Sequence, residues 1–123
     1  MAQLNEGNVI ALPATAAGVR GTAVKISGGL VVVSTAATDK TIGVLDVDHD
    51  AGQQANVRLR SGSGTSIGRA GGNIAVGDYV TPTTGGELIA TTTAGNEVVG
   101  LAIESAVDDG LFEFINWTGT HKA

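Results

Sequence analysis

The chain of 123 residues contains no cysteine, which excludes disulfide bonds and thiolate metal sites and fits assembly in a reducing cytoplasm. Aromatic residues make up only 3% of the sequence, so the core must be built from small aliphatic side chains. Such side chains bury little apolar area each, and ordering the 19 glycines is costly in entropy. We therefore expect a protomer of modest stability that gains from association.

The sequence also lacks long apolar runs and an excess of basic residues. No run approaches the ~18 apolar residues of a membrane-spanning helix, and the segment Met1–Gly7 has neither the basic start nor the apolar stretch of a signal peptide. The chain has seven Lys and Arg residues and 12 Asp and Glu residues, which gives a net charge of −5. Because Lys and Arg supply most of the affinity for nucleic acid, we do not expect nucleic acid as a partner. Because no long apolar run is present, we do not expect a membrane as a partner either.

Helical periodicity is absent as well, and what the chain has is a succession of short β-type runs separated by glycine-rich turns. In residues 53–60, for example, Ala55, Val57 and Leu59 alternate with Asn56 and Arg58, which is the pattern of a strand with one buried face. Many such runs predict an all-β fold, a small barrel or sandwich. The expected strands are residues 22–26, 30–35, 41–48, 53–60, 65–69, 78–81, 87–92, 97–106 and 111–117.

Two glycine landmarks recur at one fixed offset. Gly28-Gly29 returns as Gly85-Gly86, and Gly43 returns as Gly100, each 57 residues further along the chain. Internal repeats of this kind indicate duplicated structural units, although similar hairpins alone would also produce the match. We predict two similar hairpin-rich β-units, at about residues 19–60 and 76–117, packed face to face in a single domain. Residues 1–18 are then an extended N-terminal arm, and residues 118–123 are a C-terminal tail.

The segment before the first predicted unit carries a short apolar run, Val9, Ile10 and Leu12, which ends at Pro13. It can be an edge strand, a frayed terminus, or an arm that docks on a neighbouring protein. A purely solvated tail has no use for apolar side chains, so these three residues are candidates for an interface with another subunit or a neighbouring protein.

The stretch that most resembles a functional site contains Asp46, Asp48 and Asp50. In an extended chain their carboxylates would point to one side, as the ligands of a Ca²⁺ ion do. Counted from Asp46, an EF-hand would need Gly at its sixth position and Glu at its twelfth, but Ala51 and Val57 stand there. A solvated strand end is the alternative interpretation, and we expect no metal site. His49 lies beside these carboxylates but has no assignable nucleophile, so we expect no catalytic residue, no cofactor and no enzyme activity.

Three further residues are interface candidates. Arg58 and Arg60 share one strand face, where they can bind a phosphate, form an ion pair across an interface, or simply carry surface charge. Trp117, at the end of the last predicted strand, either completes the core or anchors a protein contact.

Four stretches of the chain resemble, in the same order, the small phage capsid cement or decoration proteins. In that family an Ile-Gly-Val strand is followed by an Ala-Gly-Asp-x-Val turn; here the turn reads Ala75-Val-Gly-Asp-Tyr-Val80, which departs from the pattern by one residue. The resemblance covers about residues 20–115 and is carried by order and spacing more than by any one motif. The stretches are Asp39-Lys-Thr-Ile-Gly-Val-Leu45, Gln54-Ala-Asn-Val-Arg58, Gly71-Gly-Asn-Ile-Ala-Val-Gly-Asp-Tyr-Val-Thr81 and Val98-Val-Gly-Leu-Ala-Ile-Glu104.

The resemblance implies a structural virion protein with a barrel-like β-fold that binds the outer surface of a phage head and cements neighbouring major capsid subunits. It implies no chemistry. The expected partners are the major capsid protein and further copies of the chain, with a trimer favoured over a dimer. The alternative is a surface module that recognises a carbohydrate or receptor. The scarcity of aromatic rings (Tyr79, Phe112, Phe114 and Trp117) counts against that alternative, because sugar sites usually use such rings.

Overall fold

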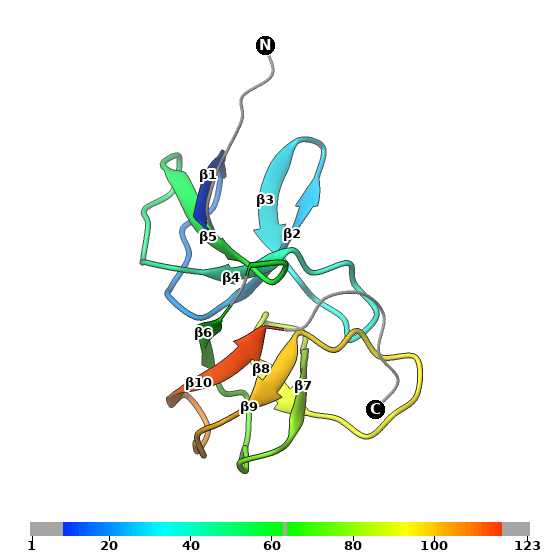
Figure 1. Ribbon diagram of the computed structural model, residues 1–123. Coiled ribbons are helices and arrows are strands. Elements are labelled where there is room, and N and C mark those ends of the chain that lie inside the picture. Colours follow the sequence, from blue (N-terminus) through cyan, green and yellow to red (C-terminus); the bar gives the residue numbers. More distant parts are fainter. Residues whose placement is uncertain (1–8, 63, 117–123) are drawn as a thin grey trace.

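Ten strands form two five-stranded antiparallel sheets in the computed structural model, which describes residues 9–62 and 64–116 (Figure 1). No helix occurs in these described ranges, and so none there is long and apolar enough to cross a membrane. The first unit contains β1 (Val9–Pro13), β2 (Ala23–Ser27), β3 (Leu30–Val33), β4 (Gly43–Leu45) and β5 (Gln54–Leu59). The second unit contains β6 (Thr65–Arg69), β7 (Tyr79–Pro82), β8 (Leu88–Ala90), β9 (Gly100–Ala102) and β10 (Leu111–Asn116).

The two sheets repeat one another strand by strand. Their orders are β1-β5-β4-β2-β3 and β6-β10-β9-β7-β8, so each strand of the first unit has its equivalent five strands later. The registers agree too: Val24 pairs with Gly43 in the first unit, and Val80 pairs with Gly100 in the second. The predicted pair of similar β-units is therefore well supported by the topology, which hairpin resemblance alone would not produce.

The number of residues that separates equivalent positions of the two units increases by one within the first hairpin of each unit, β2–β3 and β7–β8. Ser27 pairs with Leu30 across a two-residue turn, whereas the equivalent turn runs from Thr83 to Glu87, joined by a backbone hydrogen bond of 2.8 Å from the Thr83 N–H to the Glu87 carbonyl. Strands before this turn are accordingly related by 56 residues, and strands after it by the 57 residues visible in the sequence.

The all-β prediction is confirmed, and of the predicted barrel or sandwich the structure forms two antiparallel sheets and no closed barrel within the described ranges. There, one isolated parallel bridge between Ala70 and Leu88 links the two edges of the second sheet. The strand β1 lies in the segment predicted as an arm; it is an edge strand paired with β5, and it occupies the same place in its sheet as β6 does in the second. Residues 9–13 and 65–69 therefore take part in the two similar sheets, although they lie outside the predicted repeats at 19–60 and 76–117.

The strands predicted at residues 41–48 and 97–106 are much shorter than the sequence suggested. Each leaves its sheet after three residues, at Leu45 and at Ala102. The remainder bends and returns to pair through one isolated bridge, Gly18 with His49 in the first unit and Ile74 with Ala106 in the second. A run of alternating apolar residues does not reveal such a bend, because both halves of the run still have buried positions.

Each unit encloses its own cluster of buried side chains. The first cluster combines buried residues of β2 to β5 with partly buried Ile10 and Leu12 of β1. The second is larger because Phe112 and Phe114 lie at its centre, fully buried with their ring centroids 5.8 Å apart. Ala23 and Val44 of the first unit also belong to the second cluster, so the two units share a buried boundary.

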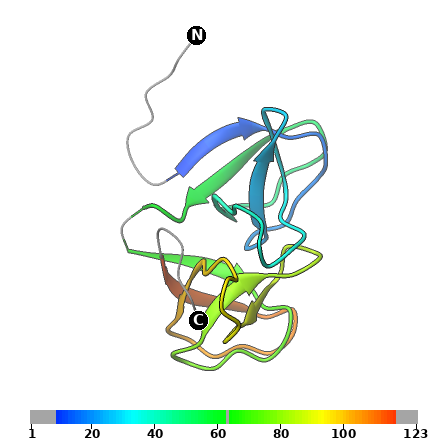
Figure 2. The same cartoon turned by 90° about the vertical axis from the view of Figure 1, so that its right-hand side faces the viewer.

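The second unit covers the outer face of the first sheet, and the units are stacked one on the other (Figures 1 and 2). The turn between β7 and β8 sits on β2: the Ala23 N–H donates to the Gly86 carbonyl at 2.7 Å. Beside it, the Arg69 N–H donates to the Gly21 carbonyl at 3.0 Å. The contact is therefore made by a turn of one unit on a sheet face of the other, and not by two equivalent faces as predicted.

Candidate contact surfaces

The apolar residues expected to dock on a neighbour are mostly used inside the molecule. Ile10 and Leu12 point inward from β1 and pack on the first cluster, whereas Val9 is 39% exposed. The alternation along an edge strand explains this division, since successive side chains point to opposite faces. Of these three candidates, Val9 alone has an exposed side chain, and Ile10 and Leu12 are partly buried.

Arg60 is buried at the boundary between the units. Its guanidinium donates to the Glu97 carboxylate at 2.9 Å and to the Val98 carbonyl at 2.6 Å, both in the second unit, and to the Thr41 carbonyl at 3.2 Å in the first. Its side chain is only 9% exposed. The ion pair that the sequence suggested thus forms, but within the chain, where it joins the two units.

Arg58 takes part in the same boundary at a more open place. Its Nε–H donates to the Thr65 carbonyl at 2.7 Å, and the side chain is half-buried. It lines a small polar pocket of about 210 Å³ together with Arg20 and Asp46. Trp117, the last interface candidate, lies outside the described residues.

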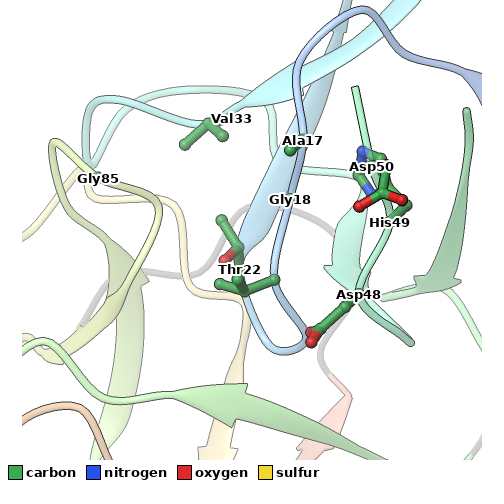
Figure 3. Close-up of a pocket in the computed structure, with 9 residues that line it drawn as sticks. Ala17, Gly18, Thr22, Val33, Asp48, His49, Asp50 and Gly85 are labelled. Atoms are coloured by element: carbon green, nitrogen blue, oxygen red, sulfur yellow. The ribbon is translucent and has the colours of Figure 1, made fainter. Parts of the chain in front are cut away.

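The segment Asp46–Asp50 borders a larger pocket of about 430 Å³ between the units (Figure 3). The carboxylate of Asp48 accepts a hydrogen bond of 2.7 Å from the Arg20 N–H, and Asp50 lies further along the segment next to His49. Among the described residues, the three aspartates do not form a group whose carboxylates lie close enough together to hold one ion. Because the segment bends, the one-sided alignment expected of an extended chain is not present.

His49 is a structural residue of this segment. Its Nε2 donates to the Ala16 carbonyl at 2.9 Å, which fixes the ring against the loop before β2. The ring also takes the space beside Gly18, where a Cβ would lie 2.6 Å from the His49 Cε1. We find no serine or threonine hydroxyl bonded to the ring among the described contacts, so no nucleophile and base pair is assembled there.

A cluster of carboxylates that the sequence analysis missed lies on the second unit. Oxygens of Glu87, Asp108 and Asp109 lie within 4.8 Å of one another. A side-chain hydrogen bond with Asp109 raises the pKa of Glu87; desolvation and the charges of Asp109 and Asp108 add to this shift, and Arg69 opposes it. The residues are far apart in the sequence, and only the approach of the β7–β8 turn to the turn before β10 brings them together.

We expect Glu87→Gln to raise the melting temperature at pH 7. The folded protein holds the Glu87 proton more tightly than the unfolded chain, so this contribution to stability is complete below the unfolded pKa and is lost as the pH rises through the folded pKa. The advantage of the glutamine should therefore shrink toward ~pH 4. Asp50→Asn, which removes one exposed charge elsewhere, is the control in the same thermal scans. Equal gains from both variants at pH 7 would contradict this prediction.

Several exposed or partly exposed apolar side chains lie together on the outer face of the second sheet. Directly paired residues place Tyr79, Leu101 and Ile115 in one row across β7, β9 and β10. Ile103 and Ile115 are 38% and 41% exposed. We call the part of this surface that is exposed among the described residues the uncovered face, and it comprises Ile67, Leu101, Ile103, Leu111 and Ile115.

The sequence contained a signal for the uncovered face. In β10, Phe112 and Phe114 point into the core, and the flanking positions Leu111 and Ile115 on the other side of the strand are apolar, with Glu113 between them. A strand with one solvated face normally alternates with polar residues, as β5 does. Apolar side chains on both sides of one strand therefore indicate a second contact, and exposed apolar patches are typical of interaction sites.

Comparison with known proteins identifies a matching family and a similar solved structure. The sequence model of a family described as phage cement protein matches residues 4–116. The fold is similar to a solved structure described as the head fiber gp8.5 N base in bacteriophage phi29, with a TM-score of 0.69 and 21% sequence identity. That alignment covers 94% of this chain and 98% of the other chain, and at this identity it shows a common fold. No curated protein sequence matches the chain.

Proposed function

The chain belongs to the phage cement protein family and is a structural protein of a phage virion, and from this premise we propose that it binds the outer surface of the phage head and cements neighbouring major capsid subunits. The observation that carries the proposal is the family match over residues 4–116, which includes both β-units. No catalysis is required, because a protein that binds only the assembled lattice lowers the free energy of that lattice.

The charge and the surface of the chain support this function. A net charge of −5 suits the outside of a head better than its DNA-facing lumen, where phosphate would repel it. The uncovered face supplies apolar area for a protein contact. The copies are proposed to act as a homo-oligomer, a trimer in preference to a dimer, placed over a local symmetry axis of the capsid after assembly in the host cytoplasm.

The carbohydrate-binding alternative has less support. Phe112 and Phe114 are fully buried, and Tyr79 is half-buried in the row of the uncovered face. The described residues therefore offer no cluster of exposed rings on which a sugar could stack.

Purified protein mixed with expanded and unexpanded heads of the same phage tests the proposal. We expect co-sedimentation with expanded heads alone, because the proposed site spans coat subunits in their mature arrangement. Bound protein should also raise the temperature at which the heads release DNA; at a free concentration of 100 times Kd, each site contributes about 2.7 kcal/mol. Equal binding to both kinds of head, or binding to neither, would refute the function.

A further inference from the structure

An apolar groove lies in the first unit between the loop of residues 15–18 and the edge strand β3. It has a volume of about 310 Å³, and the buried side chains of Val24 and Leu45 line it together with Val31 and Val33 of β3. We call this space the β3 groove. It adjoins the pocket of about 430 Å³ described above, because four residues line both: Ala17, Gly18, Val33 and His49 (Figure 3).

The equivalent place in the second unit is closed. There the Gly71 N–H donates to the Leu88 carbonyl at 2.8 Å, beside the parallel bridge between the sheet edges. So close an approach favours glycine, since a Cβ on Gly71 would lie 3.0 Å from the Glu87 Cβ. In the first unit Thr15 stands at the position of Gly71, and no described backbone bond joins it to Val31, the equivalent of Leu88. A threonine in place of the glycine therefore keeps the loop away from β3.

The loop is held in place from its other side. Gly18 and His49 exchange two backbone hydrogen bonds of 3.0 Å, and the His49 Nε2 bonds to the Ala16 carbonyl at 2.9 Å. The Thr15 carbonyl accepts from the Gly52 N–H at 3.2 Å. These bonds fix the loop to the segment before β5, so the β3 groove is already formed in the free protein, which lowers the cost of binding.

The wall formed by β3 offers hydrogen-bonding groups as well as apolar side chains. At the end of the strand, the Ser34 N–H donates to the Ala23 carbonyl at 2.9 Å. Because backbone groups alternate in direction along an antiparallel strand, those of Val31 and Val33 point away from β2, to the free edge of the sheet. Among the backbone bonds described, none uses these edge groups. A free strand edge beside an apolar groove is suited to an extended peptide segment.

The adjoining pocket is acidic at its border. Asp48 and Asp50 line it, and neither carboxylate forms an ion pair with a basic side chain among the described residues (Figure 3). The second unit has Ser105 and Val107 at the equivalent positions, so the fold itself does not require the two charges. The whole space is thus apolar along β3 and negatively charged beyond the loop.

We propose that the β3 groove binds a short extended segment of the major capsid protein, in which an apolar side chain that enters the groove is followed by a lysine or arginine that reaches Asp48 and Asp50. The inference rests on the proposed function, because its partner is the capsid. Charge complementarity favours this occupant over a second copy of the chain, whose net charge is −5 and whose Lys25, Arg60 and Arg69 already bond within the chain.

A tryptophan at the rim of the groove tests the apolar part of the site. Ala17 is exposed and lines both pockets, so Ala17→Trp obstructs them without altering the core. Ala94→Trp, at an exposed turn of the second unit, is the matched control. In co-sedimentation with expanded heads, we expect Ala17→Trp to bind about tenfold more weakly than wild type, as when a buried anchor is lost, and Ala94→Trp to bind like wild type. Equal affinities of the two variants would overturn the inference.

A charge-neutralising pair tests the acidic part and leaves the core untouched. The Asp48 carboxylate accepts from the Arg20 N–H at 2.7 Å, and the amide oxygen of Asp48→Asn can still do so. Glu104→Gln is the matched control, since the exposed Glu104 carboxylate accepts from the Glu113 N–H at 2.8 Å. We expect Asp48→Asn to weaken binding to expanded heads about threefold at low salt, and less at ~0.5 M NaCl, where charges are screened. An equal loss from Glu104→Gln would contradict an acidic end of the site.

Photochemical cross-linking identifies the occupant directly. Ala16→Cys gives the chain its only cysteine, at an exposed position that lines the β3 groove, and a benzophenone attached there reacts with whatever occupies it. On expanded heads, we expect mass spectrometry to find a coat-protein segment with an apolar residue followed by a lysine or arginine. Cross-linking to a second copy of the chain, or to a coat segment without a basic residue, would overturn the inference.

The proposed function and this inference fail in different ways. A wild-type protein that does not bind expanded heads refutes the function, and with it the partner assigned to the groove. A wild-type protein that binds them no better than Ala17→Trp refutes the groove as the site and leaves capsid binding standing.

Discussion

Gly100→Ala is expected to reduce the free energy of unfolding by about 3 kcal/mol or more, at the upper end of the usual cost of overpacking. A Cβ on Gly100 would overlap the Phe114 ring and the Ile115 carbonyl of the paired strand. The backbone of β10 is fixed by its pairing with both β9 and β6, so the carbonyl cannot move aside without breaking the sheet. Gly43 has the same role in the first unit, where a Cβ would overlap the Arg58 carbonyl.

Denaturant unfolding measures this effect, with Gly72→Ala as the control. Gly72 has an ordinary backbone conformation, and a Cβ there would meet its nearest neighbour, Ile89, only at 4.0 Å. We expect the control to stay within about 0.5 kcal/mol of wild type or to gain slightly from reduced chain entropy. Similar stabilities for Gly100→Ala and Gly72→Ala would show that β9 and β10 are not packed as closely as described.

Arg60→Met is expected to reduce the free energy of unfolding by about 3 kcal/mol, the cost typical of removing one partner from a buried ion pair. The methionine fills much of the space but leaves the Glu97 carboxylate and the carbonyls of Thr41 and Val98 without their donor. Because these acceptors belong to both units, the variant should loosen the boundary between them.

Hydrogen exchange of the Glu97 and Ala23 amides, which bond across the boundary to Ala37 and Gly86, reports on this loosening. Arg58→Met is the control, since Arg58 is more exposed and, among the described contacts, its side chain donates to the Thr65 carbonyl alone. A cost at Arg60 no larger than that at Arg58 would mean that the buried ion pair adds nothing to the junction.

The hairpins and the inward positions of β5 were predictable because they depend on local chemistry. Glycine pairs specify tight turns, and alternation specifies which side of a strand is buried. The equivalence of β1 and β6 was not predictable, because their side chains have almost nothing in common. It appears only in the register, where Ile10 opposes Val57 and Ser66 opposes Phe114. Backbone pairing preserved the repeat there after side-chain similarity had been lost.

The candidate sites show a different limit. Arg58 and Arg60 were predicted as candidates for an interface with another protein, and within the chain their side chains bond to Thr65 and Glu97 of the other unit. A sequence does not distinguish an acceptor brought by folding from one brought by another protein. The uncovered face was not predicted, because the strands that carry it have apolar residues on both sides and only the pairing of β7, β9 and β10 separates those sides.

The joining of a turn to a face gives the molecule a direction. Two units related by a dyad would present the same surface at both ends, whereas here each unit points the same way along the stack (Figure 1). A copy held to a surface by one end must therefore offer a chemically different end to the surroundings. Every copy that is attached in the same manner therefore exposes the same end of the molecule to the surroundings.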